Sequence, residues 1–182
     1  MYFSSYPKII YDSSGQNRPK VVTNILRRVA IRAKVKDNAM LYDTYDIRNG
    51  DTPESLAHQL YKNPELHWVI LMTNDIADRY HQWPMYEHQF NTYINEKYDN
   101  PDGVHHYEIS QSSGDAKTKI EVYANEALYT GDTDFYSNAT IVTNREYEEQ
   151  QQDNKRRIKL LDPRFVDQFV QEFESLIGET PI

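Results

Sequence analysis

Residues 105–108 carry the side chains best suited to bind a metal ion in this sequence. His105 and His106 offer imidazole nitrogens and Glu108 offers a carboxylate, and both groups are common zinc ligands. In a regular β-strand, however, adjacent side chains point to opposite faces, so the two histidines could not bind one ion. We therefore predict a strand with polar side chains here and no metal site.

Two other groups of residues are weaker candidates for chemistry. Asp132, Thr133 and Asp134 look like the start of a calcium loop, but the glycine and the closing glutamate that such a loop needs do not follow. Ser55 and His58 could supply a nucleophile and a base, yet the sequence shows no third group that would orient the histidine. We predict no catalytic residues, no cofactor and no enzyme activity.

Composition points to contact surfaces. The chain of 182 residues has no cysteine, which excludes disulfides, thiolate zinc sites and cysteine nucleophiles. It has 15 tyrosines against 6 phenylalanines and 2 tryptophans. Because tyrosine covers apolar area and still carries a hydroxyl, this balance favours surfaces that bind other proteins. We predict that Tyr2, Tyr6 and Trp83 contact a partner.

Charge is distributed unevenly along the chain. The net charge is -8, but residues 18–36 hold seven basic residues and no acidic one, a local +7, so the remainder carries -8 minus 7, or -15. We predict that this segment docks on an acidic protein or on a neighbouring copy through Arg27, Arg28, Arg32 and Lys34. Nucleic acid is not the expected partner, because the rest of the chain would repel phosphate.

The sequence predicts no association with a membrane. No run approaches the roughly 18 apolar residues of a membrane span. The first residues also lack the basic end and the apolar run of a signal peptide. We expect the chain to be made and kept in a cytoplasm-like compartment.

The predicted fold class is α+β, with a strand–helix–helix core. A short strand around Tyr45 precedes a helix that begins at Pro53, where the missing N–H costs nothing. Asp51 or Thr52 can cap that helix. A second helix is predicted at residues 65–73, and its apolar character indicates that it is buried.

The flanking regions give further predicted elements. Residues 21–36 fit a strand or a helix, and their β-branched residues favour a strand towards the end of the segment. In the middle of the chain, the sequence predicts a helix at residues 86–98 and a hairpin of two strands at 104–109 and 118–123. An irregular stretch at 124–145 and a solvated helix at 146–157 are predicted to follow. A strand at 158–161 follows.

The last helix, Pro163 to Gly178, is the most amphipathic of the chain. Its apolar stripe contains Phe165, Phe169 and Phe173, which could pack on this chain or on another; we predict partner contacts. The sequence thus predicts an extended N-terminal arm at residues 1–40 and the core at 41–85. A middle region at 86–150 contains a helix, the β-hairpin and the irregular stretch, and a C-terminal strand–helix arm follows at 151–182.

Residues 45–57 resemble the LysM module, a strand–helix–helix–strand unit best known for binding peptidoglycan and chitin. The matching positions are Gly50, Asp51 and Thr52 before the first helix and Asn74 after the second. The resemblance implies a LysM-like core and, as an alternative function, a peptidoglycan-binding module of a tail or cell-wall-associated protein. Residues 76–84 depart from the usual Pro-Gly turn and closing strand, so we do not expect peptidoglycan to be the main partner.

A second resemblance covers nearly the whole chain. Five segments carry it in order, at residues 63–75, 83–85, 105–108, 143–148 and 155–161. Together they resemble the small baseplate wedge proteins of contractile-tailed, T-even-like bacteriophages. This resemblance implies a virion structural protein of the tail baseplate, made in the host cytoplasm, that clamps wedge subunits together around the central hub.

The same resemblance implies the partners. They would be the large baseplate wedge proteins, the sheath-initiating protein and adjacent wedges of a sixfold baseplate, gripped by residues 1–36 and 158–177. A glycan-cleaving enzyme is the remaining alternative, but it would need a paired glutamate and aspartate in a cleft. The sequence singles out no such pair.

Overall fold

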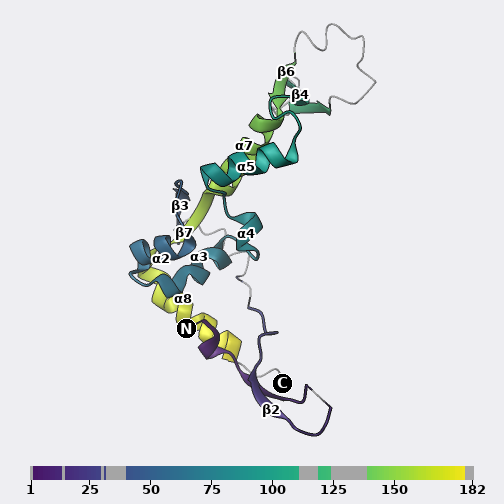
Figure 1. Cartoon of the computed structure of the whole chain (residues 1–182). Helices are drawn as coiled ribbons and strands as arrows, with labels where there is room; N and C mark the ends of the chain where they lie inside the picture. Colours follow the sequence, from purple (N-terminus) through teal and green to yellow (C-terminus); the bar gives the residue numbers. More distant parts are fainter. Residues whose placement is uncertain are drawn as a thin grey trace. The chain divides into compact units, whose positions relative to one another are not determined.

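The computed structural model describes residues 2–13, 15–29, 31, 40–110, 119–123 and 139–178. Helices and small antiparallel sheets make up these residues, which confirms the α+β class. The contacts divide the chain into two units, Met1–Trp83 with Arg157–Ile182, and Pro84–Arg156 (Figure 1). This grouping joins the C-terminal strand and helix, which were expected to form a separate arm, to the first unit.

The first unit is built on a two-stranded antiparallel sheet of β3 (Tyr42–Asp46) and β7 (Arg157–Leu161). Helices α2 (Pro53–Tyr61) and α3 (His67–Thr73) pack beside it, joined by the 3-10 turn η2 (Pro64–Leu66). The short helix α4 (Arg79–Gln82) follows. The buried side chains of this core include Ile47, Leu56, Ala57, Val69, Ile70, Ile158 and Leu161.

Local capping signals begin the helices of this unit. Thr52 is the N-cap of α2: its hydroxyl accepts the Ser55 N–H, and the Ser55 hydroxyl accepts the Thr52 N–H. Pro53 takes the first helical position, as predicted. Asn63 caps η2 in the same way by accepting the Glu65 N–H. The second predicted helix therefore starts with a tighter 3-10 turn before α3.

The N-terminal segment contains more structure than an extended arm. After the 3-10 turn η1 (Tyr2–Ser5), β1 (Lys8–Tyr11) pairs antiparallel with β2 (Lys20–Thr23). The Asp12 carboxylate accepts the N–H groups of Gly15 and Arg18 and so stabilises the connecting turn. β2 reaches into the start of residues 21–36, and residues 24–29 and 31 form no strand. The strand expected towards the end of this segment falls mostly on residue 30 and residues 32–36, which lie outside the described residues.

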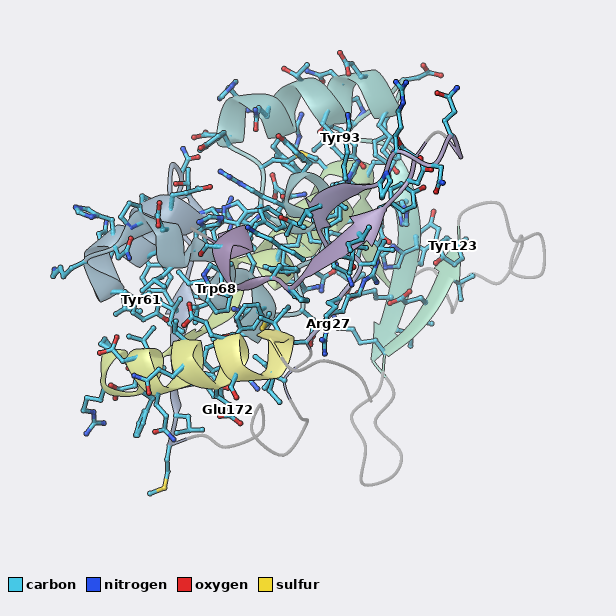
Figure 2. All side chains as sticks on the ribbon, turned by 90° about the horizontal axis from the view of Figure 1, so that it is seen from below. Arg27, Tyr61, Trp68, Tyr93, Tyr123 and Glu172 are labelled. Atoms are coloured by element: carbon cyan, nitrogen blue, oxygen red, sulfur yellow. The ribbon has the colours of Figure 1, made fainter. Side chains whose placement is uncertain are left out.

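Helix α8 (Pro163–Gly178) packs on its own chain. Asp162 caps it by accepting the Arg164 N–H. On the apolar stripe, the Phe173 ring lies 4.4 Å from that of Trp68, and the Phe169 ring lies 6.1 Å from it. Figure 2 shows Trp68 beside this helix, whose outer face carries Glu172. The stripe is thus part of the core of the first unit.

The second unit combines a three-stranded antiparallel sheet with two helices. The strand order is β5 (Lys119–Tyr123), β4 (Val104–Ser110) and β6 (Thr140–Thr143). Helix α5 (Glu87–Lys97) precedes the sheet, and α7 (Asn144–Arg156) follows it. The β4–β5 pairing confirms the predicted hairpin strands, whose connection lies outside the described residues.

Two predictions for this unit are wrong. β6 lies in the stretch predicted to be irregular, because a four-residue strand is too short to show a period and forms here by pairing with β4. Helix α7 was predicted to be solvated, yet Glu148 and Gln152 are buried. The Gln152 side-chain carbonyl accepts a hydrogen bond from the Met85 N–H at 2.9 Å. The polar composition of this helix gives no sign that one of its side chains is buried to make this bond.

Candidate interaction surfaces and histidine–carboxylate cluster

The Gly50–Asp51–Thr52 motif forms the connection between β3 and α2. Gly50 has a φ of 99°, in the left-handed region that favours glycine. The Asp51 carboxylate accepts hydrogen bonds from the Tyr45 hydroxyl at 2.8 Å and the Arg48 N–H at 2.9 Å. The pKa of Tyr45 is raised, mainly because the side chain is partly buried and also because its hydroxyl donates to Asp51. The polar groups of the motif thus bind one another and hold the loop in place.

Asn74 has an equally internal role. Its side-chain amide donates to the Lys159 carbonyl at 2.8 Å, and its side-chain carbonyl accepts the Lys159 N–H at 2.7 Å. The same amide also donates to the Ile70 carbonyl. Asn74 therefore ties the end of α3 to β7, and the residues singled out by the LysM resemblance act here as structural links.

Several predicted partner contacts lie inside the chain. Tyr6, Trp83 and Phe173 are each less than a tenth exposed, and the Trp83 indole donates to the Asp51 carbonyl at 3.0 Å. Phe165 and Phe169 are half-buried against the core. In this structure these five aromatic side chains hold the first unit together. We therefore do not carry them into the proposed interface.

The basic segment is described only in part. Arg28 is exposed and Arg27 is half-buried, and one guanidinium nitrogen of Arg27 is buried without a hydrogen bond. Arg32 and Lys34 lie outside the described residues, as do Asp132 to Asp134. For Tyr2, the structure describes only the backbone, in η1. Partner binding by the basic segment stays a prediction.

The N-terminal hairpin carries an exposed apolar surface that was not predicted from the sequence. We define the hairpin surface by three residues: Ile10, Val21 and Leu26 are 76%, 68% and 84% exposed. All residues of β1 and β2 are exposed. Their apolar pairs, Ile9-Ile10 and Val21-Val22, were the available sequence signal. Ile10 and Val21 are direct partners across the two strands, and neighbouring exposed apolar side chains of this kind are typical of a protein–protein contact.

The second unit contains a cluster of histidines and carboxylates. A bulge between Val104 and His106 interrupts the regular alternation of β4, and the Nδ1 atoms of His105 and His106 lie 2.8 Å apart. The expectation that these side chains point to opposite faces is wrong, because it assumed a regular strand. Across the sheet, His106, Glu108 and Glu121 bring ligand-type atoms within 4.8 Å of one another.

An ion pair between the buried Glu148 and the partly exposed Lys97 connects the two helices of the second unit. The Glu148 carboxylate accepts bonds from the Lys97 ammonium at 2.6 Å and the Tyr98 hydroxyl at 2.9 Å. Burial alone would raise the pKa of Glu148, but these two bonds outweigh it and lower the pKa. The bonds to Glu148 and Tyr93 raise the pKa of Lys97. This pair has a structural role.

Among the described residues, no helix has both the length and the apolar character that crossing a membrane requires.

The described residues define an α+β protein whose N-terminal hairpin carries exposed apolar side chains. The sequence pattern of the family described as Base plate wedge protein 53 matches residues 1–116, and the chain belongs to this family. It is also similar to Baseplate wedge protein gp53 of Enterobacteria phage T4, with 35% identity over 86 residues. That match spans 46% of this chain and 44% of the relative, so this chain covers less than half of the relative's length.

Proposed function

We propose that this protein is a structural component of a phage tail baseplate wedge and that it clamps wedge subunits together around the hub. Membership of the Base plate wedge protein 53 family supports the baseplate location. The proposed partners are large wedge proteins, the sheath-initiating protein and adjacent wedges of a sixfold baseplate. The protein would be made in the host cytoplasm and would act without catalysis or a cofactor.

The observation that carries the clamping role is the hairpin surface. A two-stranded sheet has no second layer of its own and is marginally stable in water. Burying one large aliphatic side chain contributes about 1.5–3 kcal/mol. A partner that covers Ile10, Val21 and Leu26 would therefore stabilise both the hairpin and the complex.

Charge supports the same role for the neighbouring segment. Residues 18–36 carry seven basic residues in a chain whose net charge is -8, and Arg28 is exposed directly after the hairpin surface. Arg32 and Lys34 would extend this basic segment towards an acidic partner surface. Such charge complementarity sets the orientation of docking and speeds the encounter.

Co-purification of the full-length chain with the large wedge proteins of its own phage tests the proposal. We expect the double variant Ile10→Asp and Leu26→Asp to lose the complex, because two buried carboxylates would have to be desolvated at the interface. The control is Gln168→Asp, which adds a carboxylate at an exposed position of α8. Retention of the complex by the double variant, with an unchanged circular dichroism spectrum, would refute clamping through the hairpin surface.

A peptidoglycan-binding module is the second candidate. β3, α2 and α3 follow one another in the chain, with Gly50 and Asp51 before α2, and β7, which comes after the second unit, pairs with β3. This arrangement supports a LysM-like core. Co-sedimentation with purified peptidoglycan separates the two proposals. Saturable binding that survives the hairpin substitutions would favour the glycan module, whereas its absence would leave the structural role.

A further inference from the structure

Three side chains with metal-binding groups converge on one face of the sheet in the second unit. His106 and Glu108 are two residues apart on β4, so they share a face, and Glu121 lies opposite Glu108 on β5. One ligand atom from each side chain lies within 4.8 Å of the other two. The irregularity between Val104 and His106 belongs to the pairing of β4 with β6, and β4 pairs with β5 in an unbroken register from His106 onward.

His106 supplies evidence beyond the presence of acidic residues. The residue is 2% exposed, and its Nε2 atom is buried without a hydrogen-bond partner. This nitrogen points at the carboxylates, 3.7 Å from Oε1 of Glu108, which is too far for a hydrogen bond. A buried polar atom in this state is unfavourable unless another group binds it.

The neighbouring histidine orients the His106 ring. Because the two Nδ1 atoms lie 2.8 Å apart, one donates and the other accepts. When His106 donates, its Nε2 keeps a lone pair directed at Glu108, which is the arrangement of metal-binding histidines. His105 stacks on Tyr147, with the two ring centroids 3.9 Å apart, and this contact holds the His105 ring in place beside His106.

The two glutamates also favour a bound cation. Like charges directly opposite each other in an antiparallel pair destabilise a sheet, and Glu108 and Glu121 form such a pair. The Lys119 ammonium contacts Oε2 of Glu108, whereas Oε1 faces His106. Lys119 is more than half exposed, so it neutralises the pair only in part.

We propose that His106, Glu108 and Glu121 bind one divalent transition-metal ion, Zn²⁺ being the best fit, and that this ion holds β4 to β5. Zinc accepts imidazole and carboxylate ligands at about 2.0–2.2 Å, which sets two ligands of one tetrahedral ion roughly 3–4 Å apart. The distance of 3.7 Å from Nε2 to Oε1 fits that requirement. A water molecule would complete the coordination. His105 is a positioning residue and not a ligand, so the ion needs only one of the two histidines.

Calorimetric titration of the EDTA-stripped full-length chain with ZnCl₂ tests the site. We expect one Zn²⁺ per chain and a higher thermal midpoint with zinc than without it. Glu121→Gln, at an exposed position, should weaken binding at least about tenfold. The matched control Glu96→Gln, on the exposed face of α5, should bind zinc as the parent chain does.

Cobalt supplies an independent readout of the ligands. Co²⁺ bound to the parent chain should give a visible absorption spectrum that Glu121→Gln changes and Glu96→Gln does not. Circular dichroism of the metal-free variants confirms that each is folded. Absence of zinc binding by the parent chain, or equal zinc affinity of the folded Glu121→Gln variant, would overturn the proposal.

Discussion

Asn74 pairs with the backbone of Lys159 as a neighbouring strand would. Its side chain donates to the Lys159 carbonyl at 2.8 Å and accepts the Lys159 N–H at 2.7 Å. These two residues are 85 positions apart in the chain. One edge of β7 pairs with β3. At the opposite edge, the Asn74 side chain binds the Lys159 N–H and carbonyl groups, which would otherwise need water as their hydrogen-bond partner.

Removing the Asn74 side chain should destabilise the first unit. We expect Asn74→Ala to lower the free energy of unfolding by about 1–3 kcal/mol, because the Lys159 backbone groups lose their partners. Urea denaturation followed by circular dichroism measures this loss. Gln59→Ala, at an exposed position of α2, should change the stability by less than about 0.5 kcal/mol. Equal effects of the two substitutions would show that the pairing contributes nothing.

The position of Phe173 predicts a folding defect. Its ring is 4% exposed and packs on Trp68, so Phe173→Ala should cost about 3–5 kcal/mol. A denaturation curve shows the loss before any partner is added. Leu176→Ala, on the same helix and 42% exposed, should cost far less. If Phe173→Ala left the stability unchanged and only abolished binding to wedge proteins, the helix would be a partner contact instead.

Gly50 and Gly178 form a matched pair for testing backbone strain. Gly50 has a φ of 99°, and no atom lies within 4 Å of a Cβ built there. Gly50→Ala should therefore destabilise by about 1–2 kcal/mol through conformation alone. Gly178 has equally open space but no positive φ, so Gly178→Ala should be neutral or slightly stabilising. Thermal unfolding of both variants compares them directly.

The Glu148–Lys97 pair predicts how stability depends on pH. The folded-state pKa of Glu148 lies below the usual value of 4.5, so its contribution is present above that value and is lost as the pH falls through the folded pKa. The pKa of Lys97 is raised above 10.5, so its contribution is lost only as the pH rises beyond that value.

The variant Glu148→Gln tests the acidic side of this dependence. Unfolding free energies measured from about pH 7 to pH 3 should fall less steeply for the variant than for the parent chain. Glu149→Gln, at an exposed position one residue along α7, is the control and should keep the parent slope. Parallel curves for the parent chain and Glu148→Gln would contradict the role of the pair.

Helix starts were predictable because capping acts over three or four residues. Thr52 with Pro53 and Asn63 with Pro64 begin their elements as the sequence indicates. The resemblance to baseplate wedge proteins was also available from the sequence, and family membership confirms it. The hairpin surface was harder to predict, because the short apolar pairs Ile9-Ile10 and Val21-Val22 do not indicate whether these side chains are buried or exposed.

The α+β class, the local caps and the amphipathic character of α8 follow from the amino-acid sequence. The pairing of β7 with β3, the packing of α8 on Trp68 and the contact between His105 and His106 follow from how the chain packs. The two groups of features differ in range, because caps and periodicity depend on residues a few positions apart. Strand partners, helix docking and bulges depend on side chains that meet only after distant segments have packed together.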